Sequence, residues 1–289
     1  MASLAFHSPN TIDEAVALLA ANPGARPLSG GTDLIVQMRS GRSAPNAIVD
    51  LKRIAGLTGV RRDGDGFAIG AATPCTALKA DQALVAAWPG VVEAANLIGS
   101  VQVRNRATMA GNLCNASPAA DSVPALIAAG ATALIAGPSG RREVPVENIA
   151  TSPGRTSLAP GEFVVEIRLP ARPSGGGDAY LRSIPRTEMD IAVVGAGASL
   201  VLGRDGTCTA ARIALGAVAP TALLVADAGA ALVGTQLGDA ALDKMAAAVT
   251  AACRPIDDKR GPATYRTAMA AVLARRVVAI ARQRAGENA

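Results

Sequence analysis

The chain has 289 residues, 50% of them hydrophobic but only 2% aromatic, so it is long enough for two domains and builds its core from aliphatic side chains. The net charge of +5 comes from lysines and arginines scattered along the chain, and this dispersion, with only one Trp, two Tyr and three Phe, argues against nucleic-acid binding. The four cysteines are far apart and include no C-x-x-C pair, which argues against a local zinc or iron–sulfur motif and favours reduced thiols in the cytoplasm.

The N-terminal stretch, residues 1–55, predicts a small βαβ-like lobe. Thr11-Ile12-Asp13-Glu14 is typical of a capping box, so we expect a helix from there to about Ala21. The rest of the lobe is predicted as a strand over 26–29, a helix over 32–39 and a strand over 47–51. The charges of Asp13 and Glu14 so near the N-terminus argue against a signal peptide.

The next stretch, residues 56–175, predicts a second lobe. An Asp-Gly turn within residues 60–69 indicates a hairpin. Apolar runs then predict helices within 75–87, 89–99 and 124–129, and strands near 132–136 and 163–169. The uncharged stretch 122–140 contains two prolines, so we expect a buried helix followed by a strand rather than a membrane span. Residues 170–177, with three consecutive glycines, are the best candidate linker.

The C-terminal part, residues 176–289, shows a different pattern. Two long strands, over 191–202 and 209–218, are predicted to form an antiparallel hairpin around Gly203-Arg204-Asp205-Gly206. Helices are expected over 221–229, 239–252 and 262–284. Gly195-Ala196-Gly197 lies inside the first strand and no helix follows it, so it indicates close backbone packing rather than a dinucleotide-binding fingerprint.

Two glycine turns about eighty residues apart are the most informative local features. The first glycine turn is Pro27-Leu28-Ser29-Gly30-Gly31-Thr32-Asp33-Leu34, and the second is Thr108-Met109-Ala110-Gly111-Asn112. Glycine lets backbone N–H groups approach an anion closely, and a helix start adds a favourable dipole. Two such turns could hold one elongated, phosphate-bearing cofactor from two sides; ordinary tight turns are the alternative interpretation.

Few side chains in this sequence are suited to catalysis. His7 is the single histidine and is expected in a solvated loop, so neither a Ser–His–Asp nor a Cys–His assembly is plausible. Carboxylates such as Asp33 and Asp239 lie where helix N-termini favour negative charge. The composition therefore suits a protein that holds a cofactor with chemistry of its own.

Four segments in chain order resemble the flavin-binding medium subunit of the xanthine dehydrogenase and carbon-monoxide dehydrogenase family, the molybdenum hydroxylases. The first glycine turn resembles its A-G-G-T-D-L turn, and residues 98–121 resemble its I-G-x-x-Q-I-R-N-x-G-T-I-G-G-N…A-S-P-x-x-D stretch. Tyr180-Leu181-Arg182 resembles the opening of its C-terminal domain, and Asp257-Asp258-Lys259-Arg260-Gly261 resembles the lead into its last helix. The resemblance covers nearly the whole chain.

This resemblance implies an α+β fold. A two-lobed FAD-binding domain of the vanillyl-alcohol-oxidase (PCMH) type would cover residues 1–175, with lobes of about 1–55 and 56–175. A smaller C-terminal domain with an antiparallel sheet and helices would cover 176–289. The implied function is that of an FAD-carrying electron-transfer subunit. It would pass electrons from the [2Fe-2S] clusters of a small subunit to an external acceptor, while a large subunit oxidises the substrate at a molybdopterin centre. A cytoplasmic heterotrimer, or a dimer of heterotrimers, follows.

The family's FAD-binding residues carry over by position. The first glycine turn would wrap the diphosphate and ribityl chain. Gly30, Gly31 and Thr32 would donate hydrogen bonds through their backbone N–H groups, and Asp33 would act at a helix start. The remaining positions are Ile98 and Gly99 near the ring system, Ala107, Thr108, Gly111, Asn112 and Asn115 in the second turn, Asp121 toward cofactor hydroxyls, Val164 beside the isoalloxazine, and Arg182 near it.

This chain departs from the family pattern at several places. Ala110 stands where the family usually has the first glycine of its second pair, and Arg182 stands where xanthine dehydrogenases carry a lysine. The sequence has no cysteine-bearing insertion for a further iron–sulfur cluster. Thr32 occupies a position where some related oxidases have a flavin-linking histidine, so we predict non-covalent FAD.

Two other functions remain open from the sequence. A self-contained flavin oxidase or reductase of the same fold, such as a cell-wall precursor reductase, would need a substrate pocket and a proton donor, and the few acid–base residues count against it. A non-enzymatic scaffold with incidental glycine turns would bind no flavin. The substrate of the complex and its electron acceptor (NAD, quinone, a cytochrome or oxygen) are not encoded in these residues.

Overall fold

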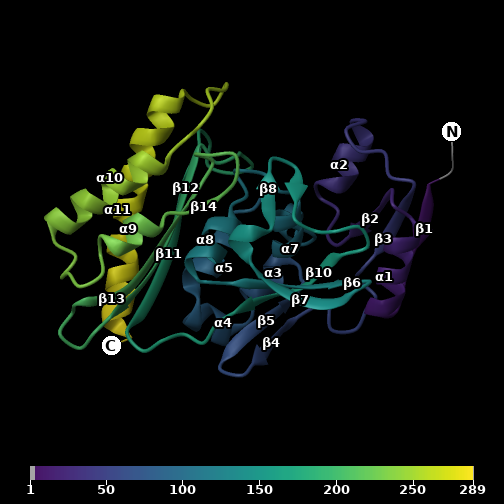
Figure 1. Ribbon diagram of the computed structural model, residues 1–289, viewed down its shortest axis with the longest axis horizontal. Coiled ribbons are helices and arrows are strands. Elements are labelled where there is room, and N and C mark those ends of the chain that lie inside the picture. Colours follow the sequence, from purple (N-terminus) through teal and green to yellow (C-terminus); the bar gives the residue numbers. More distant parts are fainter. Residues whose placement is uncertain (1–3, 289) are drawn as a thin grey trace.

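The computed structural model describes residues 4–288 and places the N-terminal and C-terminal parts of the chain side by side along the long axis of the molecule (Figure 1). The two-lobed FAD-binding domain and the C-terminal domain of antiparallel sheet and helices, expected from the resemblance, are confirmed. The boundaries 1–175 and 176–289 stay a prediction.

The first lobe is a three-stranded parallel sheet with two helices. Its elements are β1 (Ala5–His7), α1 (Ile12–Ala21), β2 (Ala25–Leu28), α2 (Leu34–Arg39) and β3 (Ala47–Asp50). The strand order is β1-β3-β2, with both neighbours parallel to β3. Thr11 caps α1, because its hydroxyl accepts a hydrogen bond from the Glu14 N–H at 3.1 Å. His7 is the last residue of β1, so the expectation that it lies in a loop was wrong.

The second lobe centres on a five-stranded antiparallel sheet in the order β4-β5-β10-β6-β7. The strands are β4 (Val60–Asp63), β5 (Gly66–Gly70), β6 (Thr132–Gly137), β7 (Gly140–Pro145) and β10 (Phe163–Leu169). A short hairpin, β8 (Ala150–Ser152) and β9 (Arg155–Thr156), follows the 3-10 helix η1 (Val146–Asn148). Sequence patterns predicted the β4–β5 hairpin and missed β7, whose charged side chains are exposed at the sheet edge.

Short helices cover this sheet: α3 (Cys75–Leu78), α4 (Gln82–Ala87), α5 (Pro89–Asn96), α6 (Val101–Arg104), α7 (Met109–Cys114) and α8 (Ser122–Ala128). Helix α5 lies within the predicted range 89–99 and ends at Asn96. Gly99 follows with a φ of +53°, a left-handed conformation in which a helix does not continue. Ser100 then caps α6 through a hydrogen bond from the Val103 N–H.

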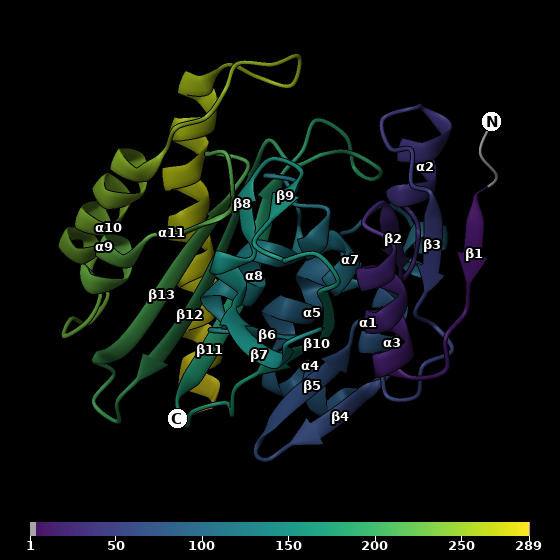
Figure 2. The same ribbon diagram turned by 45° about the vertical axis from the view of Figure 1, so that its right-hand side comes forward.

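The C-terminal part is a four-stranded antiparallel sheet in the order β11-β12-β13-β14. Its elements are β11 (Gly176–Ser183), β12 (Val194–Leu202), β13 (Cys208–Gly216), β14 (Leu223–Leu224), α9 (Ala226–Ala230), α10 (Asp239–Ala252) and α11 (Ala263–Glu287). Figure 2 shows α11, with α10 and α9 beyond it, on the outer side of this sheet. Gly176 and Gly177 belong to β11, so the predicted linker 170–177 is shorter than expected, and a Cβ on Gly177 would lie 2.0 Å from the Ala281 carbonyl oxygen of α11.

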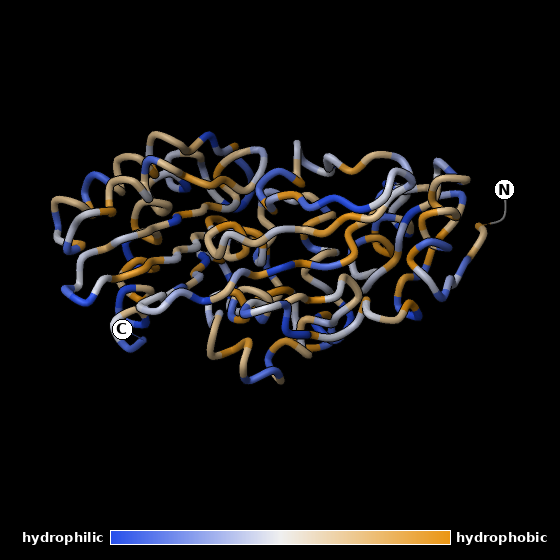
Figure 3. Tube along the Cα trace, turned by 60° about the horizontal axis from the view of Figure 1, so that its bottom comes forward, coloured by the Kyte–Doolittle hydropathy of each residue, from blue (hydrophilic) through white to orange (hydrophobic). Residues whose placement is uncertain are grey.

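The inner face of this sheet packs on the FAD-binding domain. Helix α8 contacts β12 and β13, and α5 contacts β11. Gly197 allows this approach, because a Cβ there would lie 2.7 Å from the Pro124 carbonyl oxygen, so the prediction of close backbone packing at 195–197 is confirmed. The apolar stretches run through the interior of both parts (Figure 3). Within residues 4–288, every helix is too short or too polar to span a bilayer.

Candidate functional site

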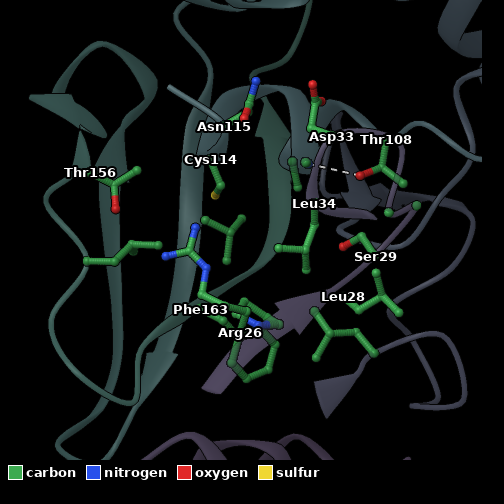
Figure 4. A pocket seen from close by; sticks show the side chains of 18 of the residues that line it. Arg26, Leu28, Ser29, Asp33, Leu34, Thr108, Cys114, Asn115, Thr156 and Phe163 are labelled. Atoms are coloured by element: carbon green, nitrogen blue, oxygen red, sulfur yellow. Dashed lines mark hydrogen bonds between the residues drawn. The ribbon is translucent and has the colours of Figure 1, made fainter. Parts of the chain in front are cut away.

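A cavity of about 420 Å³ lies between the two lobes of the FAD-binding domain, a volume typical of cofactor pockets. Three parts of the chain form its walls: the end of α1 with the β2–α2 region, residues 98–115 around α6 and α7, and residues 156–164 before and at the start of β10. Figure 4 shows side chains from all three directed toward a common space. Each wall comes from a different part of the sequence, so the cavity exists only when both lobes are folded.

The two glycine turns touch each other at this cavity. A Cβ on Gly30 would lie 1.9 Å from the Arg106 carbonyl oxygen and 3.0 Å from the Ala107 Cα, both just before the second turn. Any residue other than glycine at position 30 would therefore push the two turns apart. Gly31 has a φ of +77°, the left-handed conformation that favours glycine. The sequence predicted that these distant turns act together, and the structure brings them into contact.

The first glycine turn presents a series of backbone N–H groups that have no acceptor. Among the described residues, none of the N–H groups of Gly30, Gly31, Thr32, Asp33 and Leu34 donates a hydrogen bond. A run of backbone N–H groups without protein acceptors that lines a cavity is suited to binding an anion. Because α2 has only six residues, the N–H groups rather than a helix dipole are the main attraction.

The polar side chains of the second glycine turn are instead bound to protein neighbours. The Thr108 hydroxyl accepts a hydrogen bond from the Gly111 N–H at 2.9 Å and caps α7. The Asn112 Oδ1 accepts bonds from the Ser122 N–H and hydroxyl at 3.2 and 2.8 Å. The Asn115 Oδ1 accepts a bond from Gln37 Nε2 of α2 at 2.8 Å. Since both amide oxygens are occupied, Asn112 and Asn115 keep their NH₂ groups as the donors left for a ligand.

Burial and hydrogen bonding shift the pKa values of ionisable groups around the cavity. Burial raises the pKa of the Asp33 carboxyl, and it raises the pKa of the Cys114 thiol to about 12, opposed by the nearby charge of Arg26. The hydrogen bond from Arg142 lowers the pKa of Glu162. Asp33 stands at the N-cap of α2, the helix start expected for it, although its side chain makes no capping hydrogen bond.

Most residues predicted from the sequence line the cavity. Fifteen of the eighteen do so: Pro27, Leu28, Ser29, Gly30, Gly31, Thr32, Asp33, Leu34, Ile98, Ala107, Thr108, Gly111, Asn112, Asn115 and Val164. The other three, Gly99, Asp121 and Arg182, lie outside its lining. Their contact with a cofactor stays a prediction, as do the individual roles of the fifteen.

Asp121 and Arg182 form a buried ion pair where the FAD-binding domain meets the C-terminal sheet. Arg182 Nη1 lies 2.7 Å from Asp121 Oδ2, and the Tyr180 hydroxyl donates to Asp121 Oδ1 at 3.2 Å. Burial raises the pKa of Asp121 to about 6, opposed by Arg182 and by the bond from Tyr180. Asp121 is followed by Ser122, which binds Asn112, so this ion pair connects β11 with the second glycine turn.

Sequence reasoning missed several parts of the cavity wall, three of them around the first glycine turn and at the start of β10. Arg26 and Gln37 flank the first glycine turn on either side and line the cavity. The third part is residues 158–163, Leu158-Ala159-Pro160-Gly161-Glu162-Phe163, which approach from the second lobe. Arg26 and Gln37 could have been found because they stand close to the recognised motif in the sequence. Nothing in the irregular stretch before β10 indicated a ligand. In the described part of the chain, no cluster of His, Cys, Asp or Glu side chains could hold a metal ion.

Comparisons with known proteins agree with this geometry. Residues 2–172 match the model of the FAD binding domain in molybdopterin dehydrogenase, and residues 179–281 match that of the CO dehydrogenase flavoprotein C-terminal domain. The carbon monoxide dehydrogenase medium chain of Afipia carboxidovorans is 39% identical over 98% of both chains. A putative xanthine dehydrogenase FAD-binding subunit of Escherichia coli K12 is 36% identical over 75% of this chain and 74% of its own.

Solved structures give the same result. A chain of the reconstituted CO dehydrogenase from Oligotropha carboxidovorans superimposes with a TM-score of 0.94 at 39% identity, covering 98% of both chains. A chain of quinoline 2-oxidoreductase from Pseudomonas putida 86 does so with a TM-score of 0.90 at 28% identity, also over 98% of both chains.

Proposed function

Because the chain belongs to the family of FAD-binding subunits of molybdopterin-dependent dehydrogenases, we propose that it binds FAD non-covalently in the cavity between its glycine turns and transfers electrons from a partner's iron–sulfur clusters to an external acceptor. The resemblance recognised in the sequence is thereby confirmed, and the chain is the flavin-carrying part of an oxidoreductase. The direction of electron flow and the individual contacts are the proposed part.

The single observation that carries the site assignment is the run of N–H groups without acceptors at residues 30–34. A diphosphate offers several anionic oxygens, each able to accept from more than one N–H group. The cavity is also lined by residues well separated from this turn in sequence, Leu19, Ile98, Pro160 and Val164, and its volume of about 420 Å³ suits a dinucleotide better than a small anion. These residues fit FAD.

The chain's own residues would hold and shield this cofactor. The first glycine turn would bind the diphosphate, and the NH₂ groups of Asn112 and Asn115 would donate to polar atoms between diphosphate and ring. Leu28, Phe163 and Val164 would keep water from the cavity walls. Bound FAD supplies the capacity to take up electrons and pass them on, which no side chain here provides.

The cavity wall favours a carrier over a self-contained flavin enzyme. Among the described lining residues the carboxylates are Asp33 and Glu162, and Glu162 accepts two hydrogen bonds from Arg142 at 2.8 and 2.7 Å. A flavin oxidase acting on an organic substrate needs a placed acid or base. We therefore assign substrate oxidation to a large molybdopterin subunit and electron delivery to a small iron–sulfur subunit, in a cytoplasmic heterotrimer or a dimer of heterotrimers.

Purification of the native complex tests this function. We expect about one FAD for each copy of this chain, released by heat without covalent attachment. Substrate of the intact complex should bleach the flavin absorbance, whereas the same substrate should leave flavin on the separated chain oxidised. A colourless native complex would contradict FAD binding. Rapid flavin reduction by an organic substrate in the separated chain would favour the self-contained enzyme.

A further inference from the structure

Arg26 is the basic residue of the cavity wall. It belongs to β2, directly before the first glycine turn, and the other residues that line the cavity within the described chain are neutral or acidic. Figure 4 shows its guanidinium directed into the cavity toward Cys114. The influence of Arg26 on the pKa of the Cys114 thiol reflects the same proximity.

Arg26 has no protein partner within residues 4–288: its guanidinium makes neither an ion pair nor a hydrogen bond there. Two other basic residues, by contrast, have protein partners. Lys52 binds Asp50 and the Ser29 carbonyl oxygen, and Arg142 binds Glu162. The two carboxylates of the cavity wall, Asp33 and Glu162, do not pair with it either. The fold thus leaves one cation available in the same cavity as a run of N–H donors that also lack acceptors.

We propose that Arg26 binds the diphosphate of the flavin dinucleotide and makes this end of the cavity selective for a phosphate-bearing nucleotide. This inference rests on the proposed function. The backbone N–H groups of the first glycine turn are neutral and supply hydrogen bonds, but they leave the negative charge of a diphosphate uncompensated. A guanidinium supplies the charge and a planar pair of donors that matches phosphate oxygens.

The alternative role for Arg26 is stacking on an aromatic ring of the nucleotide. A guanidinium can lie flat on a ring, and such a contact would not depend on phosphate. The two roles differ in which ligand they recognise. A phosphate contact strengthens the binding of ADP but not of adenosine, whereas stacking strengthens the binding of both equally. Because Arg26 is exposed, the phosphate contact should also weaken as salt concentration rises.

The test uses the native complex from which FAD has been removed. Reconstitution with FAD is followed by flavin fluorescence, and ADP and adenosine are used as competitors, for the wild type, Arg26→Gln and Arg26→Lys. The matched control is Arg282→Gln, which removes the same charge from an exposed position on α11, far along the chain from the cavity. The melting temperature of each deflavinated complex checks that the fold is retained.

We expect Arg26→Gln to weaken the binding of FAD and of ADP about tenfold, which is the effect of losing one charged hydrogen bond at an exposed site. Adenosine should be unaffected, Arg26→Lys should recover part of the loss, and the salt dependence of FAD binding should become shallower. Equal losses for ADP and adenosine, or unchanged FAD affinity at low salt, would overturn the proposal. A wild-type complex that binds no FAD would instead overturn the proposed function, so the two failures are distinguishable.

Discussion

The two glycine turns look alike in sequence but differ in the structure. The first turn leaves the N–H groups of residues 30–34 without acceptors, while the second turn commits Thr108, Asn112 and Asn115 to protein neighbours. We infer from this difference that the two turns have different roles: the first would bind the diphosphate, and the second would mainly hold the first in place, with only the NH₂ groups of Asn112 and Asn115 left for the cofactor. Substitutions that affect one turn and spare the other test this division.

The largest expected effect is that of Gly30→Val, which breaks the contact between the turns. The new side chain would overlap the Arg106 carbonyl oxygen, and overpacking against backbone costs about 3 kcal/mol of unfolding free energy or more. We expect a complex almost free of FAD with a clearly lowered melting temperature. Gly238→Ala is the control, because a Cβ there meets no atom within 4 Å. Normal FAD content in Gly30→Val would show that the turns need not touch.

Gly31→Val should act on the first turn alone. A β-branched residue at a φ of +77° is strained by about 1–3 kcal/mol, and its Cβ would lie 2.8 Å from the Leu28 Cδ1. The turn should change shape while the second turn keeps its hydrogen bonds. We expect FAD per chain to fall severely with a smaller loss of thermal stability than for Gly30→Val. A full yellow complement would contradict the assignment of this turn to the diphosphate.

The ion pair behind the second turn predicts a pH effect. The pKa of Asp121 in the folded chain, about 6, lies above its ordinary value of 3.8. Between pH 4 and pH 6 the folded chain therefore holds a proton that the unfolded chain releases. The contribution of Asp121 to the free energy of unfolding is greatest below pH 4 and declines by at most about 3 kcal/mol as the pH rises through 6.

Melting temperatures of wild type and Asp121→Asn across pH 4–7 measure this effect. The wild type should lose stability relative to the variant as the pH rises, because the asparagine does not titrate. The pKa of Asp178 is also raised to about 6, chiefly by burial. Because Asp178 is present in both proteins, its effect on stability cancels in the comparison. A constant difference between the two curves would contradict the expected protonation of Asp121.

Thr108→Val should have the smallest effect. It removes the hydroxyl that accepts the Gly111 N–H and caps α7, which costs about 1 kcal/mol. Because the first turn keeps its N–H groups, we expect a lower melting temperature with FAD content close to that of the wild type. Thr108→Ser, which keeps the cap, is the control. Loss of most FAD in Thr108→Val but not in Thr108→Ser would contradict this division, because the second turn would then be as important for FAD binding as the first.

The sequence predicted the site better than the sheets around it. Gly30 and Gly31 could be recognised because close approach and a positive φ leave few alternatives to glycine, and both constraints are local. The strand β7 was missed because Arg141, Arg142 and Glu143 give no alternation of buried and exposed residues at an edge. Strand β11 was missed because its opening glycines are typical of a linker, whereas Gly177 allows close contact with α11.

Other contacts of the site could not be read from sequence because they depend on tertiary packing. Gln37 reaches Asn115 across 78 positions, and the pairing of Asp121 with Arg182 spans 61. Residues 158–163 line the cavity only because β10 crosses the centre of the second sheet. Asp33 was predicted at a helix start and is the N-cap residue of α2, but the sequence does not show that its side chain makes no capping hydrogen bond. Local motifs thus located the turns, and the packing of the lobes defined the cavity.

Hydrogen–deuterium exchange of the native complex, with and without FAD, is the measurement that tests the central claim most directly. The account predicts that FAD slows exchange of the N–H groups of residues 30–34, which have no acceptor in the described chain. The exposed turn between β12 and β13, residues 203–207, should exchange equally in both states. FAD binding that leaves exchange at residues 30–34 unchanged would contradict the claim that these backbone groups hold the cofactor.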